Sequence, residues 1–113
     1  MSWSREEALT DPAVREPMMF VSEFRFVLRD IPNEITIRLY RPLFSGQYVA
    51  RCSHKLVIPG ANAPTAPSDD DAEPSEGRTL HNAVEELVST YNAARSQGLA
   101  PSTSWLVPDT EFC

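Results

Sequence analysis

The sequence has no long hydrophobic run, and this shortage excludes a membrane-spanning protein. Its uninterrupted apolar stretches are only a few residues long, far short of the roughly 20 residues that a membrane helix needs. The N-terminus, MSWSREEALTDP, has an acidic pair where a signal peptide would have its apolar core. We therefore expect a protein that is located in the cytoplasm and has no contact with a membrane.

Cysteine is also scarce. The 113 residues include two cysteines, Cys52 and Cys113. They are too far apart for a CxxC motif and too few for a disulfide framework. Reduced thiols are expected, which agrees with a cytoplasmic location.

The motifs of catalysis are missing as well. The chain has no glycine-rich phosphate loop, no GxSxG elbow and no HExxH motif. Cys52 and His54 share one face of a predicted strand, but nothing nearby completes a metal site or orients a nucleophile. The carboxylates fall in a predicted loop and on a helix surface, where they cannot hold a hydrolytic metal. We expect no enzymatic activity, no metal and no cofactor.

The net charge is −6, and it is unevenly distributed. Residues 1–57 carry eight Lys and Arg against seven Asp and Glu, whereas residues 58–113 carry two against nine. The acidity therefore belongs to the C-terminal half.

Two-residue alternation of apolar side chains predicts three antiparallel strands over 20–29, 34–41 and 46–58. Pro32 and Asn33 favour a reversal at 30–34, and Pro42 and Gly46 favour a second one. A short helical turn beginning at Ser4 precedes the strands. The side chains expected to face the core are Phe24, Phe26, Leu28, Ile35, Ile37, Leu39, Tyr48, Ala50 and Cys52.

Residues 59–77 contain four prolines and no large apolar side chain, so we expect a flexible acidic loop. A long amphipathic helix should follow, with Thr79 as its N-cap and Gly98 as its C-cap. The segment SWLVP either adds an edge strand or packs Trp105 against the core. The helical positions expected to be buried are Leu80, Val84, Leu87, Tyr91 and Ala94.

A helix with one apolar stripe and a sheet with one apolar face are stable only together. We therefore expect one α+β domain over residues 1–113, with a three- or four-stranded antiparallel meander and one long helix packed on one face. This is a two-layer sandwich.

The chain resembles the N-terminal domain of the HicB-like antitoxins over roughly residues 34–101. The resemblance lies in a strand that follows a glycine–tyrosine turn, a Pro-Gly pair, and a helix opened by Gly-x-Thr. It implies a degenerate ribonuclease-H-like domain that neutralises a small ribonuclease by binding it. The connection before the helix is longer and more acidic than the family pattern, and no DNA-binding segment follows, so operator binding is not expected. The matching residues are Gly46, Tyr48, Pro59, Gly60, Gly77, Thr79 and Ala83.

The alternation also places a group of basic side chains on the sheet face away from the helix. This face could meet nucleic-acid phosphates, with Tyr40 available for stacking, or an acidic protein surface. The alternative is that the charges only keep a wetted face soluble. The basic residues are Arg25, Arg29, Arg38, Arg51 and Lys55.

The acidic loop contains Asp69, Asp70 and Asp71. These residues either belong to a flexible linker between two parts of the domain or form a charged segment that attracts a basic partner. Our first hypothesis is a protein-binding module, an inhibitor or antitoxin-like partner of a small basic protein. The alternatives are a nucleic-acid-binding module that uses the basic face, and a homodimer that pairs its sheet edges.

Overall fold

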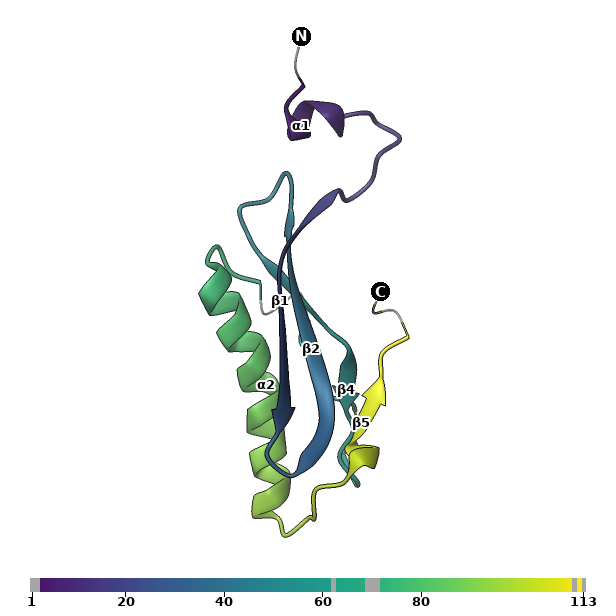
Figure 1. Ribbon diagram of the computed structural model, residues 1–113, viewed down its shortest axis with the longest axis vertical. Helices are drawn as coiled ribbons and strands as arrows, with labels where there is room; N and C mark the ends of the chain where they lie inside the picture. The colour runs from purple at the N-terminus through teal and green to yellow at the C-terminus, as the bar shows by residue number, and fades with distance from the viewer. Residues whose placement is uncertain (1–2, 62, 69–71, 111, 113) are drawn as a thin grey trace.

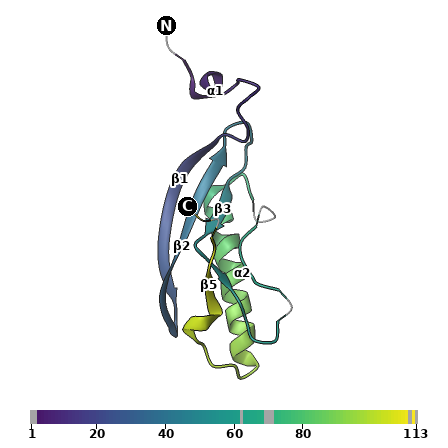
Figure 2. The ribbon, with the colours of Figure 1, turned by 90° about the vertical axis from the view of Figure 1, so that its right-hand side faces the viewer.

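The computed structural model describes residues 3–61, 63–68, 72–110 and 112. A long hairpin and a short third strand form one antiparallel sheet in the order β1-β2-β3, and β4 and β5 form a second, two-stranded sheet. Figures 1 and 2 show α2 lying along one face of the larger sheet, so the predicted α+β class is confirmed. The elements are α1 Arg5–Ala8, β1 Met18–Leu28, β2 Ile31–Pro42, β3 Val49–Cys52, β4 His54–Leu56, α2 Glu76–Ser96, η2 Thr103–Trp105 and β5 Leu106–Pro108.

The hairpin turns at Arg29 and Asp30, earlier than the predicted reversal at 30–34. Leu28 pairs with Ile31, and both side chains are buried, so the two charged residues between them form the turn. Pro32 lies inside β2, next to a register irregularity where its missing N–H is tolerated. The turn is tied to α2, because the Tyr91 hydroxyl donates to the Asp30 carboxylate at 3.1 Å and accepts from the Asp30 N–H at 3.2 Å.

The predicted third strand over 46–58 divides at Ser53. The Ser53 N–H donates to the Thr36 carbonyl at 2.9 Å, and the Ser53 hydroxyl accepts from the Thr36 N–H at 2.9 Å. Beyond Ser53 the chain leaves the first sheet, and β4 pairs with β5 instead. The C-terminal SWLVP segment thus adds a strand as predicted, while Trp105 is buried edge-to-face against Tyr91 at 6.0 Å between ring centroids.

Helix α2 begins before the predicted position. Its N-cap is Ser75, whose hydroxyl accepts from the Arg78 N–H at 3.3 Å, so the prediction of Thr79 as N-cap is wrong. Thr79 is instead fully buried, and its hydroxyl donates to the Ser75 carbonyl at 2.9 Å. Gly98, predicted as the C-cap, lies one residue later: the C-cap is Gln97, and Gly98 follows it with a φ of 85° that favours glycine.

The core lies between α2 and the inner face of β2 and β3. Ile35, Ile37 and Leu39 are completely buried there, and Leu87 is 1% exposed. Helix α2 packs mainly against β2, β3 and β4. It leaves the inner face of β1 less covered, and Phe24, which we expected in the core, is 37% exposed.

Two β-bridges hold parts of the predicted loop 59–77 against the body. One joins Leu56 to Thr65 and the other joins Tyr48 to Glu73. The N-terminal segment with α1 extends beyond the end of the hairpin, as Figure 1 shows. The flexibility of the loop remains a prediction.

Candidate interaction surface

Strand β1 is the outermost strand of the larger sheet. It is 11 residues long, and β2 is its neighbour on one side. In the described part of the chain, no strand pairs with its other edge; Figure 2 shows β1 at the outer margin of the sheet, away from β3. An open edge of this length is unusual, because soluble proteins commonly cover, charge or shorten such edges.

The side chains along this edge are unusually apolar. Met18, Phe20, Phe24 and Val27 are exposed by 45%, 54%, 37% and 54%. We call β1 with these four side chains the edge surface. Scattered apolar residues on a surface are ordinary, but four exposed ones on a single open strand make this strand a candidate interface.

A bulge divides these side chains between the two faces of the sheet. The register shifts between Phe20 and Ser22, so Phe20 packs on the outer face against Tyr40 at 6.0 Å between ring centroids. From Ser22 to Phe26 the register is regular, and Phe24 and Phe26 face the helix side opposite Ile37 and Ile35. A bulge re-aims side chains in this way without ending the strand.

The hydrogen bonds of Thr36 determine which backbone groups of β1 face the open edge. Thr36 directs both its N–H and its carbonyl towards Ser53, hence away from its β1 partner, Arg25. In an antiparallel ladder such a residue pair leaves both backbones pointing outward. Arg25 and, two residues earlier, Glu23 therefore present an N–H and a carbonyl to the open edge.

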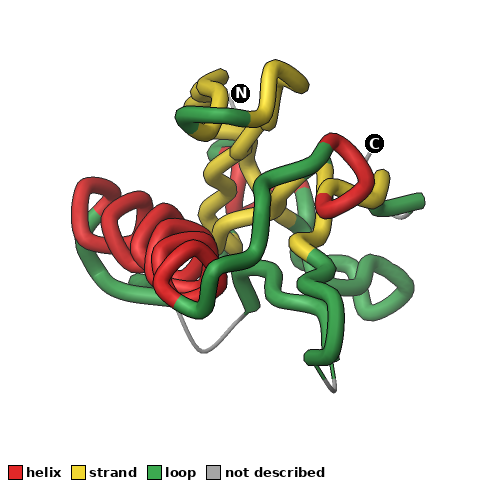
Figure 3. Tube along the Cα trace, turned by 90° about the horizontal axis from the view of Figure 1, so that it is seen from below, coloured by secondary structure: helices red, strands yellow, loops and turns green. Residues whose placement is uncertain are grey.

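A groove of about 280 Å³ runs between the end of β1 and α2. Phe26 lines one wall, and Val84 and Val88 line the other. Figure 3, seen along the long axis, shows the backbones of the hairpin and of α2 as separate elements. The two valines are only half-buried, because they lie one position around the helix from the buried stripe of Ala83 and Leu87.

The predicted basic face is present in part. Arg38 pairs with Arg51 across the strands and with Glu23 on the other side, while Arg25 and Tyr40 share this outer face. The Arg38 guanidinium lies 4.5 Å from the centroid of the Phe112 ring. The structure thus brings together Arg25, Arg38, Arg51 and Tyr40, as the alternation predicted.

Two of the predicted basic residues lie elsewhere. Arg29 is in the hairpin turn and lines the groove beside α2, because β1 ends at Leu28. Lys55 belongs to β4 and pairs with Val107, because the chain leaves the larger sheet at Ser53. The predicted acidic triad, Asp69, Asp70 and Asp71, lies outside the described residues.

Glu23 lies between two of the arginines. Its carboxylate is 2.7 Å from Arg38 Nε and 3.0 Å from Arg25 Nη2. The hydrogen bond from Arg38 is the largest cause that lowers the pKa of Glu23 below its ordinary value. Glu23 is therefore a carboxylate at neutral pH, and it offsets positive charge on the outer face.

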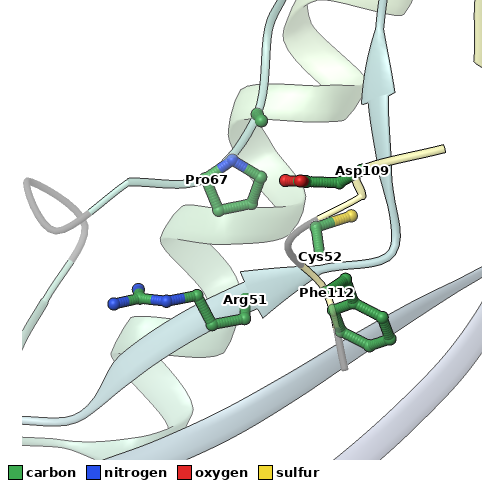
Figure 4. Close-up of a pocket in the computed structure, with 6 residues that line it drawn as sticks. Arg51, Cys52, Pro67, Asp109 and Phe112 are labelled. Carbon is green, nitrogen blue, oxygen red and sulfur yellow. The ribbon is translucent and has the colours of Figure 1, made fainter. Parts of the chain in front are cut away.

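Cys52 lines a cavity of about 110 Å³ together with Arg51, Pro67, Asp109 and Phe112 (Figure 4). Burial raises the pKa of the Cys52 thiol, which keeps it protonated and weakly nucleophilic. The ring Nδ1 of His54 lies 2.8 Å from the Ser53 hydroxyl. Sites for drug-sized ligands are usually about 300–1,000 Å³, so this cavity is small for a substrate pocket.

The described ranges contain no group of three or more His, Cys, Asp or Glu side chains that could hold a metal ion. No helix within them has the length and apolar character that crossing a membrane demands.

Sequence reasoning considered an exposed sheet edge but did not identify β1 as that edge, although one signal was available. The strict alternation of β1 is interrupted by extra apolar side chains at Phe20, Val21 and Val27. Such side chains are not expected on a sheet face that is exposed to solvent. The bulge and the open edge could be located only from the pairing of β1 with β2 in the structure.

Comparison with known proteins gives no family for this chain. No family model, no curated protein and no solved structure matches it. The resemblance to the HicB-like antitoxins therefore remains a prediction from the sequence.

Proposed function

We propose that this chain is a non-enzymatic protein-binding module, in which a partner polypeptide adds a strand to the open edge of β1. The observation that carries this proposal is the combination of outward backbone groups at Glu23 and Arg25 with exposed Phe24 beside them. In strand addition, main-chain hydrogen bonds supply affinity and neighbouring side-chain pockets supply specificity. The groove between Phe26 and Val88 is such a pocket.

Nucleic-acid binding is the less favoured alternative. Glu23 pairs with both Arg25 and Arg38, and a net charge of −6 opposes approach to a polyanion. That the partner is a small basic protein, as the antitoxin resemblance implies, stays a prediction.

A photo-crosslinking amino acid at Phe24 tests the proposal in cells that make the protein. We expect polypeptide adducts from position 24 and few from His81, an exposed position on the solvent side of α2. Arg25→Pro should abolish the adducts, because proline removes an N–H that points outward while leaving the ladder with β2 intact. Arg25→Lys, which keeps both the N–H and the charge, should retain them. Equal adduct yields from positions 24 and 81 would remove this proposal.

A further inference from the structure

We infer that the partner is a second copy of this chain, and that the two β1 strands pair antiparallel about a twofold axis beside Phe24. This pairing rests on the proposed function of the edge surface and names its occupant. The regular part of β1 runs from Ser22 to Phe26, between two register shifts. Phe24 is the midpoint of that segment, so this register pairs the whole segment with itself.

The backbone N–H and carbonyl groups of β1 that face the open edge belong to the residues that this register requires. Glu23 and Arg25 direct their N–H and carbonyl groups outward, whereas Phe24 directs its own towards β2. With the axis beside Phe24, Glu23 opposes the partner's Arg25, and Arg25 opposes the partner's Glu23. Each of these pairs then exchanges two backbone hydrogen bonds.

Charge selects this register over its neighbours. An axis beside Glu23 would oppose two carboxylates, and an axis beside Arg25 would oppose two guanidinium groups, which is destabilising at directly opposed positions. The axis beside Phe24 opposes unlike charges twice. Within one chain Glu23 already contacts Arg38 at 2.7 Å and Arg25 at 3.0 Å, so the partner's Arg25 would join or replace the second of these contacts.

The same register also covers apolar surface. Phe24 would lie directly opposite the partner's Phe24 on the helix side, with Phe26 diagonal to it, at a separation that aromatic side chains can bridge. Phe24 is 37% exposed in the single chain. Helix α2 packs mainly against β2, β3 and β4, and it meets the regular part of β1 on the helix side, where the Ser22 hydroxyl donates to the Glu76 carboxylate at 3.2 Å. The product is a continuous six-stranded sheet with both long helices on one face.

The first test measures the mass of the purified full chain by sedimentation equilibrium over a range of concentrations. We expect a monomer–dimer equilibrium in the wild type, and dissociation constants raised about tenfold by either Arg25→Glu or Glu23→Arg alone. Mixing these two variants should restore association as a heterodimer, because each charged position then opposes its opposite. The matched control is Arg78→Glu mixed with Glu85→Arg, two exposed positions on α2, where mixing should change nothing.

The second test reads the register directly. In a chain with Cys52→Ala and Cys113→Ser, the variant Phe24→Cys should form an intermolecular disulfide readily. Opposed residues at such a position have Cα atoms about 4.5 Å apart, within the range of disulfides. The control is Phe44→Cys, which places an equally new thiol at a side chain that is 63% exposed in the turn after β2, and which should crosslink slowly.

The outcomes separate the inference from the proposed function. A wild-type chain that stays monomeric at high concentration, while position 24 crosslinks to another polypeptide in cells, overturns the self-pairing and leaves the binding module standing. A dimer without the Phe24→Cys disulfide and without rescue by mixing overturns this register. A dimer that shows both supports it.

Discussion

Two neighbouring residues on α2 give the sharpest test of how the helix packs. Leu87 is 1% exposed at the centre of the core, whereas Val88 is half-buried on the wall of the groove. Truncating a buried leucine to alanine costs about 2–5 kcal/mol, and we expect about 3 kcal/mol for Leu87→Ala. This is a large part of the roughly 5–15 kcal/mol that stabilises a typical domain.

For Val88→Ala we expect a much smaller loss. The removed methyl groups are only partly covered, which gives a cost of about 1 kcal/mol. Alanine is the better helix former and returns about 0.5 kcal/mol. The net destabilisation is therefore about 0.5 kcal/mol.

Urea unfolding followed by tryptophan fluorescence measures both variants. Trp105 is buried against Tyr91 and reports on the core, whereas Trp3 is 70% exposed and changes little. In thermal unfolding, where each kcal/mol shifts the melting temperature by roughly 4 °C, Leu87→Ala should melt about 12 °C lower than the wild type. The measurement is made at two protein concentrations, since self-association would add stability at the higher one. Equal losses for the two variants would refute the burial of Leu87 beneath α2 and the half-buried position of Val88 in the groove.

Three further outcomes are expected. Tyr91→Phe removes a hydroxyl with two hydrogen bonds to Asp30 and should lower stability by about 1–2 kcal/mol in thermal unfolding; an unchanged midpoint would contradict the tie between the turn and α2. The pKa of Glu23 is lowered in the folded chain, so its stabilisation is present above the unfolded pKa and disappears as pH falls through the folded one. The urea midpoint of Glu23→Gln should therefore converge on that of the wild type in acid, and a constant gap would count against the pairing. In a Cys113→Ser chain, Cys52 should react with iodoacetamide far more slowly when folded than when unfolded, because burial raises its thiol pKa; equal rates would show that it is accessible.

Much of the fold was determined locally and could be predicted from the sequence. The alternation of Ile35, Ile37 and Leu39 and the helical spacing of Leu87 and Tyr91 each require one buried face, and all five side chains are buried. Gly98 ends the helix because few other residues adopt its backbone conformation. These features depend on neighbours in the sequence, so the sequence alone reveals them.

The candidate site was decided by tertiary structure. Whether β1 has one neighbour or two, where its bulge lies, and which of its N–H groups point outward all depend on pairing with β2 and on the contacts of Thr36 with Ser53. Likewise, Lys55 lies away from the basic face because its strand, β4, pairs with β5 and not with the larger sheet. The order of residues determines which side chains lie on each face of a strand. Which strand lies at the edge of the sheet is determined only when strands from distant parts of the chain have paired.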